Sequence, residues 1–548
     1  MPLILLFLPN LYLYFYLYDN YIILLSLFVF LFVFSILKST KYLGALFIFF
    51  LLAPFYLVYI FLYKNYINQN HIGTIFESNI VEINQFIGGN VFLFFLVFFF
   101  WFLFSLYIFY IYYKRPIVWL HRSRYWVLFS GVFYILFLLF VNFNYITEED
   151  NNERFLQGHD ISILTDLKKT YPFGLLFSIY DFYNEQKKLN NAYEKNKNYK
   201  FYAKQNKFLK QKQLFILVIG ETSRRESWGL NGYKRNTTPN LSAIDNIVNF
   251  PEMLAVSSAT REAVPMILTR KTENLVYDFD FKEKSIISVF REVGFNTYWI
   301  STQQELGRHD TSTSVYAKEA DKVIFLNQND YLSEGVLDEK LIDKTQEILL
   351  SDKSNKIFIV LHTMGSHYNY KYRYSDKYDY FRPSLNNLKS YSLHNKENKK
   401  QLINSYDNSI LYTDFVLNKL INTIEKQNSI SFIFYISDHG ENLFDGNCDK
   451  SGHGHRTKHN FEIASFIWYS KEYENKFPDK IKALKNNKNR KINQTSVFPT
   501  LVNAAAINIP NDKLERSLLK QMEEYPRIIL SNINYDQVNK ESICQEIP

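Results

Sequence analysis

Carboxylate and imidazole side chains follow three short apolar runs in the second half of the chain. Glu221, His362 and the pair Asp438-His439 come directly or almost directly after runs that end near residues 219, 361 and 436. Carboxylate oxygens and imidazole nitrogens together form a donor set suited to Zn²⁺. A solvated Glu or a capped Asp-His turn would explain each place by itself, but three such places make coincidence less attractive. The sequence therefore predicts a metal site with Glu221, Asp438 and His439 as ligands.

Thr260 is the candidate nucleophile. It precedes an apolar run, Ala263 to Leu268, for which we predict a helix with Pro265 in its first turn. A hydroxyl at a helix N-terminus gains from the helix dipole and from N–H groups that stabilise an alkoxide or a phosphoryl group. A zinc ion lowers the pKa of a ligated oxygen further. Plain N-capping by Thr260, Ser258 or Ser257 is the alternative, and the local pattern alone favours it.

Two further histidines could serve the same site. His367 ends the stretch that begins at His362, and His453 stands between two glycines that let the backbone approach a ligand closely. His453 could steady phosphate oxygens or bind a second metal ion. His455 and His459 follow it and are expected to be exposed.

A mostly parallel sheet would bring these residues together. Short apolar runs alternate with longer segments of helical period, and parallel strands present their carboxyl ends at one edge. We therefore predict an α/β domain in which a mostly parallel sheet is sandwiched by helices. The predicted strands are Leu214–Ile219, Thr297–Ile300, Ile357–Leu361, Phe432–Ile436, Ala464–Trp468 and Arg527–Leu530, and the predicted helices include Lys282–Val293, Asp338–Leu350 and Tyr406–Lys426.

The front of the chain is different in composition. Residues 1–142 hold only seven Lys or Arg and three Asp or Glu. About 20 apolar residues let a helix cross a bilayer, so five apolar segments predict an all-α membrane domain of five transmembrane helices. Pro9 and Asn10 interrupt the first segment, for which a cleaved signal peptide is the alternative. The segments are Leu3–Tyr18, Tyr21–Leu37, Leu43–Tyr63, Val91–Tyr113 and Tyr125–Val141.

Positive charge predicts the orientation of this domain. Six of its seven basic residues lie in two connections, the one between the second and third apolar segments and the one between the fourth and fifth. Both connections lie on the same side of the membrane, and the positive-inside rule makes that side cytoplasmic. The N-terminus is then also cytoplasmic, whereas loop 64–90 and everything after Val141 lie outside. In that loop Asn79 and Glu82 are either solvated or close to a lipid headgroup.

Three regions are expected: a transmembrane domain at 1–142, bridging helices and a linker at 143–213, and a catalytic domain at 214–548. Within the second region, 161–183 fits an interfacial helix pair lying on the bilayer. Residues 187–212 are rich in Lys, Asn and Gln, which is typical of a solvated linker.

Charge and cysteine content exclude some classes of protein. The net charge of +8 is spread along the chain, with 55 basic and 51 acidic residues after position 142. No basic run with interleaved aromatic residues suggests a nucleic-acid partner. Cys448 and Cys544 could form one disulfide in an oxidising compartment, but they do not amount to a disulfide framework.

The chain resembles the phosphoethanolamine transferases of the Gram-negative inner membrane, which belong to the sulfatase/alkaline-phosphatase superfamily. The resemblance covers nearly the whole length. The motifs that carry it are Gly220-Glu221-Thr222-Ser223-Arg224 followed by Leu230-Asn231-Gly232-Tyr233, Thr260 ahead of Val264-Pro265, His362-Thr363-Met364-Gly365-Ser366-His367 followed by Arg373-Tyr374, and Ser437-Asp438-His439-Gly440-Glu441.

The resemblance implies one zinc ion or two. The first ion would be held by Glu221, Thr260, Asp438 and His439, with Thr260 as the nucleophile that carries the phosphoethanolamine. It also implies that His367 and His453 contact the phosphoryl group or a second zinc. The expected substrate-binding residues are Asn79, Glu82 and His362.

The sequence departs from the lipid A-modifying members in its cysteines. Those members carry several disulfides in the catalytic domain, including a pair that brackets the nucleophile loop, where this chain has Ser and Met or Ile. The chain is therefore more similar to the cysteine-poor branch, whose acceptors include core oligosaccharide sugars and other periplasmic glycans. The resemblance thus specifies the chemistry and leaves the acceptor open.

The predicted function is transfer of phosphoethanolamine from phosphatidylethanolamine to a lipopolysaccharide or lipooligosaccharide acceptor, a core sugar or lipid A, through a covalent phospho-threonine. The enzyme is expected to be a monomer that crosses the bacterial inner membrane several times, with its catalytic domain in the periplasm. One alternative is a phosphoglycerol transferase that uses phosphatidylglycerol with manganese or magnesium. Another is a catalytically inactive membrane scaffold or sensor. A sulfatase is disfavoured because Thr260 cannot become a formylglycine.

Overall fold

The computed structural model describes residues 7–13, 20–63, 66–67, 69–77, 91–148, 167–205, 211–304, 312–327, 335–389 and 391–547. The chain divides into two compact units. One is drawn from 1–78 and 90–185, and the other begins at 186 in its described part. The sequence predicted that the transmembrane domain ends at residue 142 and that the catalytic domain begins after residue 213. These two boundaries stay predictions.

The first unit is helical. Residues 7–13 are helical as well, so helices overlap all five predicted apolar segments. The named helices are α2 (Asn20–Leu37), the 3₁₀ helix η1 (Thr40–Leu46), α3 (Phe47–Tyr63), α4 (Gln69–Glu77), α6 (Val91–Lys114), α7 (Ser123–Glu148) and the start of α9 (Phe173–Asn196).

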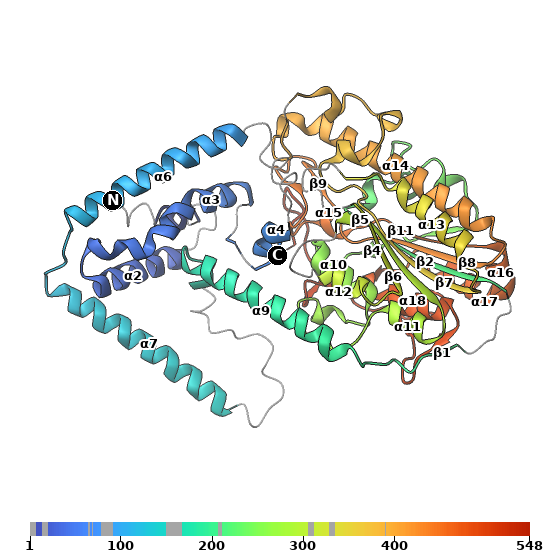
Figure 1. Ribbon diagram of the computed structural model, residues 1–548, viewed down its shortest axis with the longest axis horizontal. Coiled ribbons are helices and arrows are strands. Elements are labelled where there is room, and N and C mark those ends of the chain that lie inside the picture. The colour runs from blue at the N-terminus through green and yellow to red at the C-terminus, as the bar shows by residue number, and fades with distance from the viewer. Residues whose placement is uncertain are drawn as a thin grey trace. The chain divides into compact units, whose positions relative to one another are not determined.

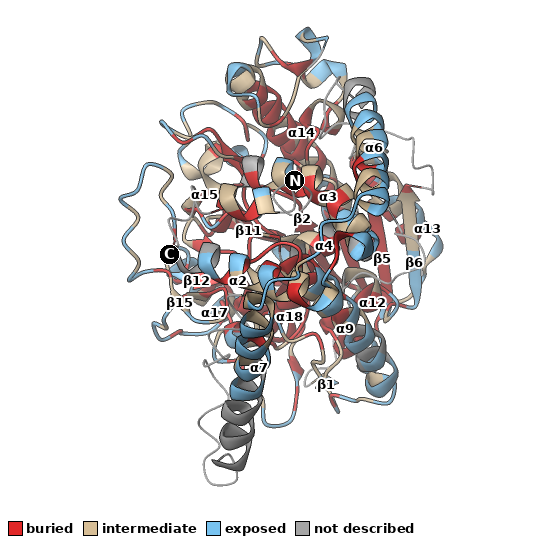
Figure 2. Cartoon of the chain, turned by 90° about the vertical axis from the view of Figure 1, so that its left-hand side faces the viewer, coloured by how far each residue is buried: buried red, intermediate tan, exposed pale blue. Residues whose placement is uncertain are grey.

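One stretch of the described residues, Phe95–Lys114 in α6, is both long and apolar enough to cross a membrane. Only 11% of its most apolar window is buried, so it is unlike the core helix of a soluble protein. Figure 2 shows α6 and α7 largely exposed, and the exposed side chains include Phe99, Tyr107, Trp126 and Phe133. Such large apolar surfaces require a nonaqueous partner. The count of five spans is not confirmed, because Leu24–Leu37 and Phe47–Ile60 are shorter.

Helix α9 corrects the prediction for the connecting region. It continues to Asn196, so residues 187–196 are helical where a solvated linker was expected. Lys, Leu, Glu and Gln are good helix formers, and their propensity outweighs the polar character of this segment. Leu175 and Phe182 on α9 are buried in the first unit beside Tyr171. The predicted interfacial pair begins in residues 161–166, outside the described part.

The second unit is built on a seven-stranded sheet in the order β3-β11-β8-β2-β7-β5-β6. The pairs β2–β7, β2–β8, β5–β7 and β5–β6 are parallel, and only β11 runs against its neighbours. The strands are β3 (Ile247–Asn249), β11 (Ser465–Tyr469), β8 (Ile430–Ser437), β2 (Gln213–Gly220), β7 (Lys356–His362), β5 (Asn296–Gln304) and β6 (Lys322–Asn327).

Strand β2 is apolar throughout because both of its faces are covered. Phe215, Leu217 and Ile219 belong to one core cluster, and Leu214, Ile216 and Val218 belong to the other. Figure 1 shows α11 (Ile286–Glu292) and α18 (Val497–Ala504) on one side of the sheet and α13 (Glu339–Ser351) and α14 (Lys399–Glu425) on the other. The predicted sandwich is thus present.

Two strand predictions need correction. Arg527–Leu530 is not part of the main sheet, since β14 (Ile528–Ile529) pairs only with β15 (Ile533–Asn534). The edge strands β3 and β6 were not predicted. Strand β3 has only three residues, and β6 carries an apolar run, Val323–Leu326, that the prediction passed over.

The remaining elements are short. The helices are α10 (Thr260–Leu268), α12 (Ser312–Ala317), α15 (Lys458–Phe461), α16 (Lys471–Lys476) and α17 (Pro478–Asn486), and the paired strands are β1 (Lys204–Gln205) with β13 (Ile507–Asn508), β9 (Asn442–Leu443) with β10 (Ser451–Gly452), and β4 (Met253–Leu254) with β12 (Ile492–Asn493).

Candidate metal centre and nucleophile

The register of the parallel strands brings the predicted ligands together. Gly220 of β2 pairs with Ser437 of β8, so the next residues, Glu221 and Asp438, emerge side by side. The Asp438 amide donates to Gly220 O at 2.9 Å, and the Thr222 amide donates to Asp438 Oδ1 at 3.0 Å. Two strand ends are thereby joined by main-chain hydrogen bonds. The geometry agrees with the predicted convergence at one sheet edge.

Thr260 reaches this edge from a separate helix. It is the first residue of α10, and the N-cap residue is Ala259, which has no side-chain capping bond. The Thr260 hydroxyl therefore does not cap the helix, contrary to the alternative drawn from local pattern. Instead, Thr260 Oγ1 lies 2.7 Å from Asp438 Oδ2, 3.3 Å from Glu221 Oε2 and 3.2 Å from His439 Nε2.

These groups form a compact donor cluster. Ligand atoms of Glu221, Asp438 and His439 all lie within 4.8 Å of one another, and the three side chains are at most 2% exposed. His439 Nδ1 is 3.0 Å from Gly440 O, which leaves Nε2 facing the carboxylates. With Thr260, the cluster offers three oxygens and one nitrogen around a common point. That set fits four-coordinate zinc.

The two buried carboxylates of the cluster need a compensating positive charge. Burial and the nearby Glu221 charge raise the pKa of Asp438 to about 7. Burial also raises the pKa of Glu221, but the hydrogen bond and charge of His439 outweigh it and hold that pKa well below its usual range. Burial lowers the pKa of His439, yet the two carboxylates prevail and raise it to about 10. A proton on His439 or a bound cation would offset the buried negative charge.

Gln303 is a residue of this site that sequence reasoning missed. Its Nε2 donates to Glu221 Oε2 at 2.9 Å and to Thr363 O at 2.9 Å. It thus orients the Glu221 carboxylate, as outer partners of metal ligands do. The sequence could have revealed Gln303, because it lies in the polar run after the predicted strand Thr297–Ile300. That strand ends at the same edge of the sheet as the strands before Glu221 and Asp438.

His367 and His453 lie next to the cluster. The His453 ring centroid is 4.5 Å from that of His439 and 5.7 Å from that of His367. His453 Nδ1 is 3.2 Å from Glu441 Oε2, and Glu441 also accepts a hydrogen bond from Tyr370 at 3.0 Å. Glu441 stands in a quoted motif, but the sequence assigned it no role. The structure gives it the role of orienting His453.

His362 lies inside the protein. It is 3% exposed, its Nδ1 is 3.3 Å from Ser301 Oγ, and its ring packs beside Trp299. Burial lowers its pKa to about 4, so the imidazole is neutral at physiological pH. This burial argues for a supporting role behind Glu221. Contact of His362 with substrate stays a prediction.

Two histidines expected to be exposed are buried. His455 is 8% exposed, and its Nε2 lies 3.0 Å from Ser451 O. His459 is 7% exposed, and its Nδ1 lies 2.8 Å from Glu226 Oε2. His455 is thus held within its own segment, whereas His459 contacts the chain after Glu221.

Glu226, Asp445 and His459 form a second group with metal-ligand chemistry. Arg224 Nη1 lies 2.7 Å from Asp445 Oδ1, and Lys458 Nζ lies 3.1 Å from Glu226 Oε1. These cations already neutralise both carboxylates. The group is therefore an ion-pair network, which ties the residues after Glu221 to the segment after His439.

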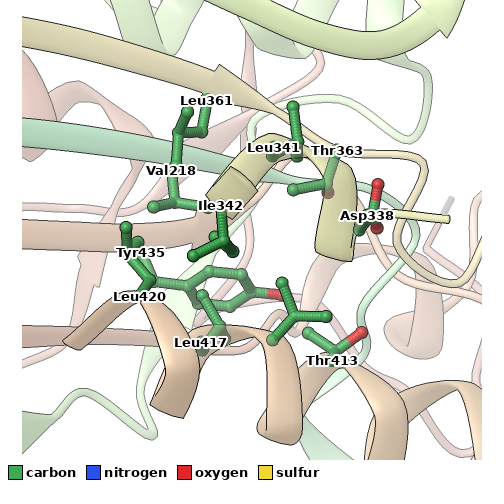
Figure 3. Close-up of a pocket in the computed structure, with 11 residues that line it drawn as sticks. Val218, Asp338, Leu341, Ile342, Leu361, Thr363, Thr413, Leu417, Leu420 and Tyr435 are labelled. Carbon is green, nitrogen blue, oxygen red and sulfur yellow. The ribbon is translucent and has the colours of Figure 1, made fainter. Parts of the chain in front are cut away.

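Asp338 supports the loop that carries His367. Its buried carboxylate accepts hydrogen bonds from Thr302 Oγ1, from Met364 N at 2.9 Å and from Gly365 N at 2.8 Å. Figure 3 shows Asp338 beside a cavity lined mainly by apolar side chains of the sheet, α13 and α14. The cavity holds about 10 Å³, room for a single water molecule at most. This cavity is therefore too small to hold a substrate.

Glycines allow the loops of the site to approach one another. A Cβ on Gly220 would stand 2.5 Å from the Tyr435 hydroxyl, and one on Gly440 would stand 2.1 Å from His459 O. Gly365 has φ +47°, and its Cβ would stand 2.6 Å from Glu221 O. The predicted motifs contain glycine at these positions because backbone or ring atoms occupy the space of a side chain.

Asn79 and Glu82, the predicted substrate-binding residues of the first loop, lie outside the described residues. Their role stays a prediction.

Comparison with known proteins agrees with this geometry. A family model described as Sulfatase matches residues 213–507. Phosphoethanolamine transferase EptC of Escherichia coli (strain K12) is 30% identical over 279 residues, covering 48% of this chain and 46% of that protein. The chain thus spans about half the length of the curated relatives it matches.

Two solved structures extend the comparison. The C-terminal periplasmic domain of EcEptC from Escherichia coli, in complex with Zn, aligns with a TM-score of 0.56 and 26% identity over 63% of this chain and 98% of that chain. The integral membrane protein lipooligosaccharide phosphoethanolamine transferase A (EptA) from Neisseria meningitidis aligns with a TM-score of 0.67 and 20% identity over 91% of each chain. The second likeness shows a shared fold along nearly the whole chain.

Substitution of Gly365 tests whether close backbone packing sets the metal site. In Gly365→Ala the new Cβ meets backbone atoms of Glu221, so the carboxylate should shift and zinc affinity should fall about 10- to 100-fold. Equilibrium dialysis against zinc measures the change. Gly294→Ala is the matched control, since φ is +84° there and a Cβ meets nothing within 4 Å. Equal zinc affinity in the two variants would contradict the role assigned to Gly365.

The buried His455 predicts a pH-dependent mutation effect. Burial lowers the pKa of His455 from the 6.5 of a free imidazole to about 3. Between these values the unfolded chain binds a proton that the folded chain does not, so the stability from His455 is present above pH 6.5 and is lost as the pH falls. The loss is about 1.4 kcal/mol per pH unit. The destabilisation caused by His455→Gln should therefore shrink by this amount per unit between about pH 6 and 4. Denaturant unfolding measures it, and a penalty independent of pH would refute the assignment.

Proposed function

The chain belongs to the sulfatase family, and from this premise we propose that it is a zinc-dependent phosphoethanolamine transferase. The observation that carries the proposal is the position of Thr260 Oγ1, which lies within 3.3 Å of both carboxylates and of the His439 imidazole. The similarity to phosphoethanolamine transferase EptC supports phosphoethanolamine as the transferred group. The donor we propose is phosphatidylethanolamine, and the acceptor is a lipopolysaccharide or lipooligosaccharide.

Glu221, Thr260, Asp438 and His439 fit a zinc ion and would hold it. When bound, zinc supplies charge that offsets the carboxylates and a Lewis acid that lowers the pKa of the Thr260 hydroxyl. The solved structure of the EptC periplasmic domain is a complex with Zn, which supports this choice of metal. The number of zinc ions, one or two, is part of the proposal.

Thr260 is the nucleophile in the proposed reaction. Asp438 is the nearest acceptor of the hydroxyl hydrogen bond, at 2.7 Å, so it fixes the orientation of the oxygen lone pairs. The start of α10 lies at the same hydroxyl, and its positive dipole end favours the negative charge of the approaching phosphoryl group. Thr260 Oγ1 forms a bond to phosphorus as the bond to the glycerol oxygen breaks. Diacylglycerol leaves with a proton, and phosphoethanolamine remains on Thr260.

In the second step an acceptor hydroxyl or phosphate attacks the same phosphorus, and the Thr260 oxygen leaves and regains a proton. His453 and His367 would stabilise the phosphoryl charge and move these protons. Both rings lie near His439, and Glu441 fixes the Nδ1 side of His453. The reaction is therefore a two-step exchange in which one side chain carries the group.

The first unit would hold the enzyme in the bacterial inner membrane. Its apolar helices and the basic residues of their connections fit a multi-pass protein with a cytoplasmic N-terminus and a periplasmic catalytic unit. Asn79 and Glu82 would then face donor headgroups. We propose five spans and a monomeric state.

Substitution of Thr260 tests the chemistry. Purified Thr260→Ala should fold and bind vesicles of phosphatidylethanolamine but release no diacylglycerol, because the attacking oxygen is gone. Thr260→Ser keeps the oxygen and should retain part of the rate. Mass spectrometry of the 253–270 region of the wild type should show one added phosphoethanolamine. Diacylglycerol release by Thr260→Ala at the wild-type rate would falsify the assignment.

The same assay separates the rival functions. Release from phosphatidylglycerol vesicles but not from phosphatidylethanolamine vesicles would indicate a phosphoglycerol transferase. An intact protein with neither zinc nor a covalent intermediate would indicate an inactive scaffold.

Mass spectrometry of lipid A and core oligosaccharide tests the acceptor. Cells that contain the protein should show a mass increase of one phosphoethanolamine unit, and cells with Thr260→Ala should not. The fragment that carries the increase identifies lipid A or a core sugar. The absence of any such increase in either fraction would contradict the proposed acceptor class.

A further inference from the structure

The end of the chain is tied to the segment that carries His453. Cys448 and Cys544, 96 residues apart, form a disulfide with a Cα–Cα distance of 4.8 Å. Beyond the disulfide, Thr457 and Glu546 form an antiparallel bridge, Lys458 N donates to Gln545 O at 3.0 Å, and Ile547 N donates to Arg456 O at 2.7 Å. Residues 544–547, here called the strap, thus hold residues 448–458 covalently at one end and by main-chain hydrogen bonds at the other.

The strapped segment also contacts other parts of the domain, since Ser451 Oγ donates to Leu393 O at 2.7 Å and Thr457 Oγ1 donates to Asn442 Oδ1 at 2.6 Å. Its hairpin, β9 with β10, has two residues in each strand, which is marginal by itself. His453 follows β10 directly, and Gly454 N donates to Ser258 O at 3.1 Å, two residues before the proposed nucleophile. Any displacement of this segment therefore moves His453 relative to Thr260 and His439.

The strap is itself anchored in the domain. Ile547 is 2% exposed and packs in a small apolar cluster with Leu254, Phe461, Ile529, Leu530 and Tyr535. The same cluster supports the chain that leads to Thr260, because Ala255 N donates to Phe461 O at 2.8 Å and Leu530 N donates to Val256 O at 2.9 Å. The ion pair of Lys450 with Glu546 adds a third link between strap and segment.

We propose that the strap is a positioning element for His453, and that Cys448, Cys544 and Ile547 are positioning residues for the transfer reaction. The inference rests on the proposed function. Glu221, Asp438 and His439 follow strand ends and Thr260 begins α10, all outside residues 448–458, whereas His453 stands within that segment. Loss of the strap therefore lowers the rate of transfer without removing zinc, since catalysis is sensitive to displacements of about 1 Å.

The test compares full-length Cys544→Ser, Cys448→Ser and the double variant with the wild type. Each should lower diacylglycerol release from phosphatidylethanolamine vesicles by about 10- to 100-fold, and the double variant should lose no more than either single one. Zinc content should equal that of the wild type. Ile543→Ser is the matched control, because Ile543 adjoins the strap and is 74% exposed, and its rate should not change.

A cycle with His453→Ala distinguishes positioning from general destabilisation. In a protein that already carries His453→Ala, Cys544→Ser should not lower the rate of diacylglycerol release any further. A wild-type rate in Cys544→Ser, an equal loss in the His453→Ala background, or loss of zinc together with activity would each overturn the proposal.

Hydrogen exchange keeps the test independent of the reaction. Amides of 448–458 should exchange faster in Cys544→Ser, while those of β8 should not change. Unchanged exchange of the amides of 448–458 would refute the positioning role of the strap, even if the enzyme transfers a different group. Faster exchange in a protein whose wild type releases no diacylglycerol would instead contradict the proposed function and leave the strap standing as structure.

Discussion

The site depends on the enforced proximity of two buried carboxylates, Glu221 and Asp438. Both are at most 2% exposed, and burial together with the nearby Glu221 charge raises the pKa of Asp438. Bringing two such charges out of water costs free energy unless positive charge accompanies them. His439 between them, the N-terminal end of α10 and a divalent cation all meet that requirement. The arrangement is therefore built to hold a cation and to receive an anionic group beside it.

The proximity is maintained by backbone rather than by side chains. Parallel pairing of β2 with β8 fixes the spacing of the two ligands, and the Thr222 amide holds the Asp438 carboxylate. Glycines then let neighbouring loops close around the strand ends, with Gly365 against the Glu221 backbone and Gly440 against His459 O. Because these contacts involve main-chain atoms, they cannot relax by a change of rotamer. Rigid positions of this kind are what preorganised electrostatic catalysis needs.

The sequence sufficed to predict the central strands and the residues at their carboxyl ends, because buried parallel strands are long apolar runs with abrupt polar ends. The edge strand β3 escaped prediction because it is only three residues long, and the apolar run of β6 was not assigned to a strand. Gln303 and Asp338 escaped it for another reason: their roles follow from hydrogen bonds to Glu221 and to Gly365, which are distant in sequence. His455 and His459 were expected to be exposed, and contacts with Ser451 O and with Glu226 bury them. Whether Cys448 and Cys544 pair could not be decided from two cysteines, and their contact depends on the fold of the last residues.

The two kinds of histidine in the site differ in what holds them. His439 follows a central strand directly, so the stability of the sheet fixes its position. His453 lies on an excursion whose hairpin is too short to be rigid alone, and contacts with the chain terminus complete its support. Glu221, Asp438 and His439 can therefore keep their positions in this fold while the excursion changes, because the sheet does not depend on it. Differences in acceptor among similar enzymes should then arise in such excursions, where substitutions alter the approach to the phosphoryl group and leave the carboxylate pair intact.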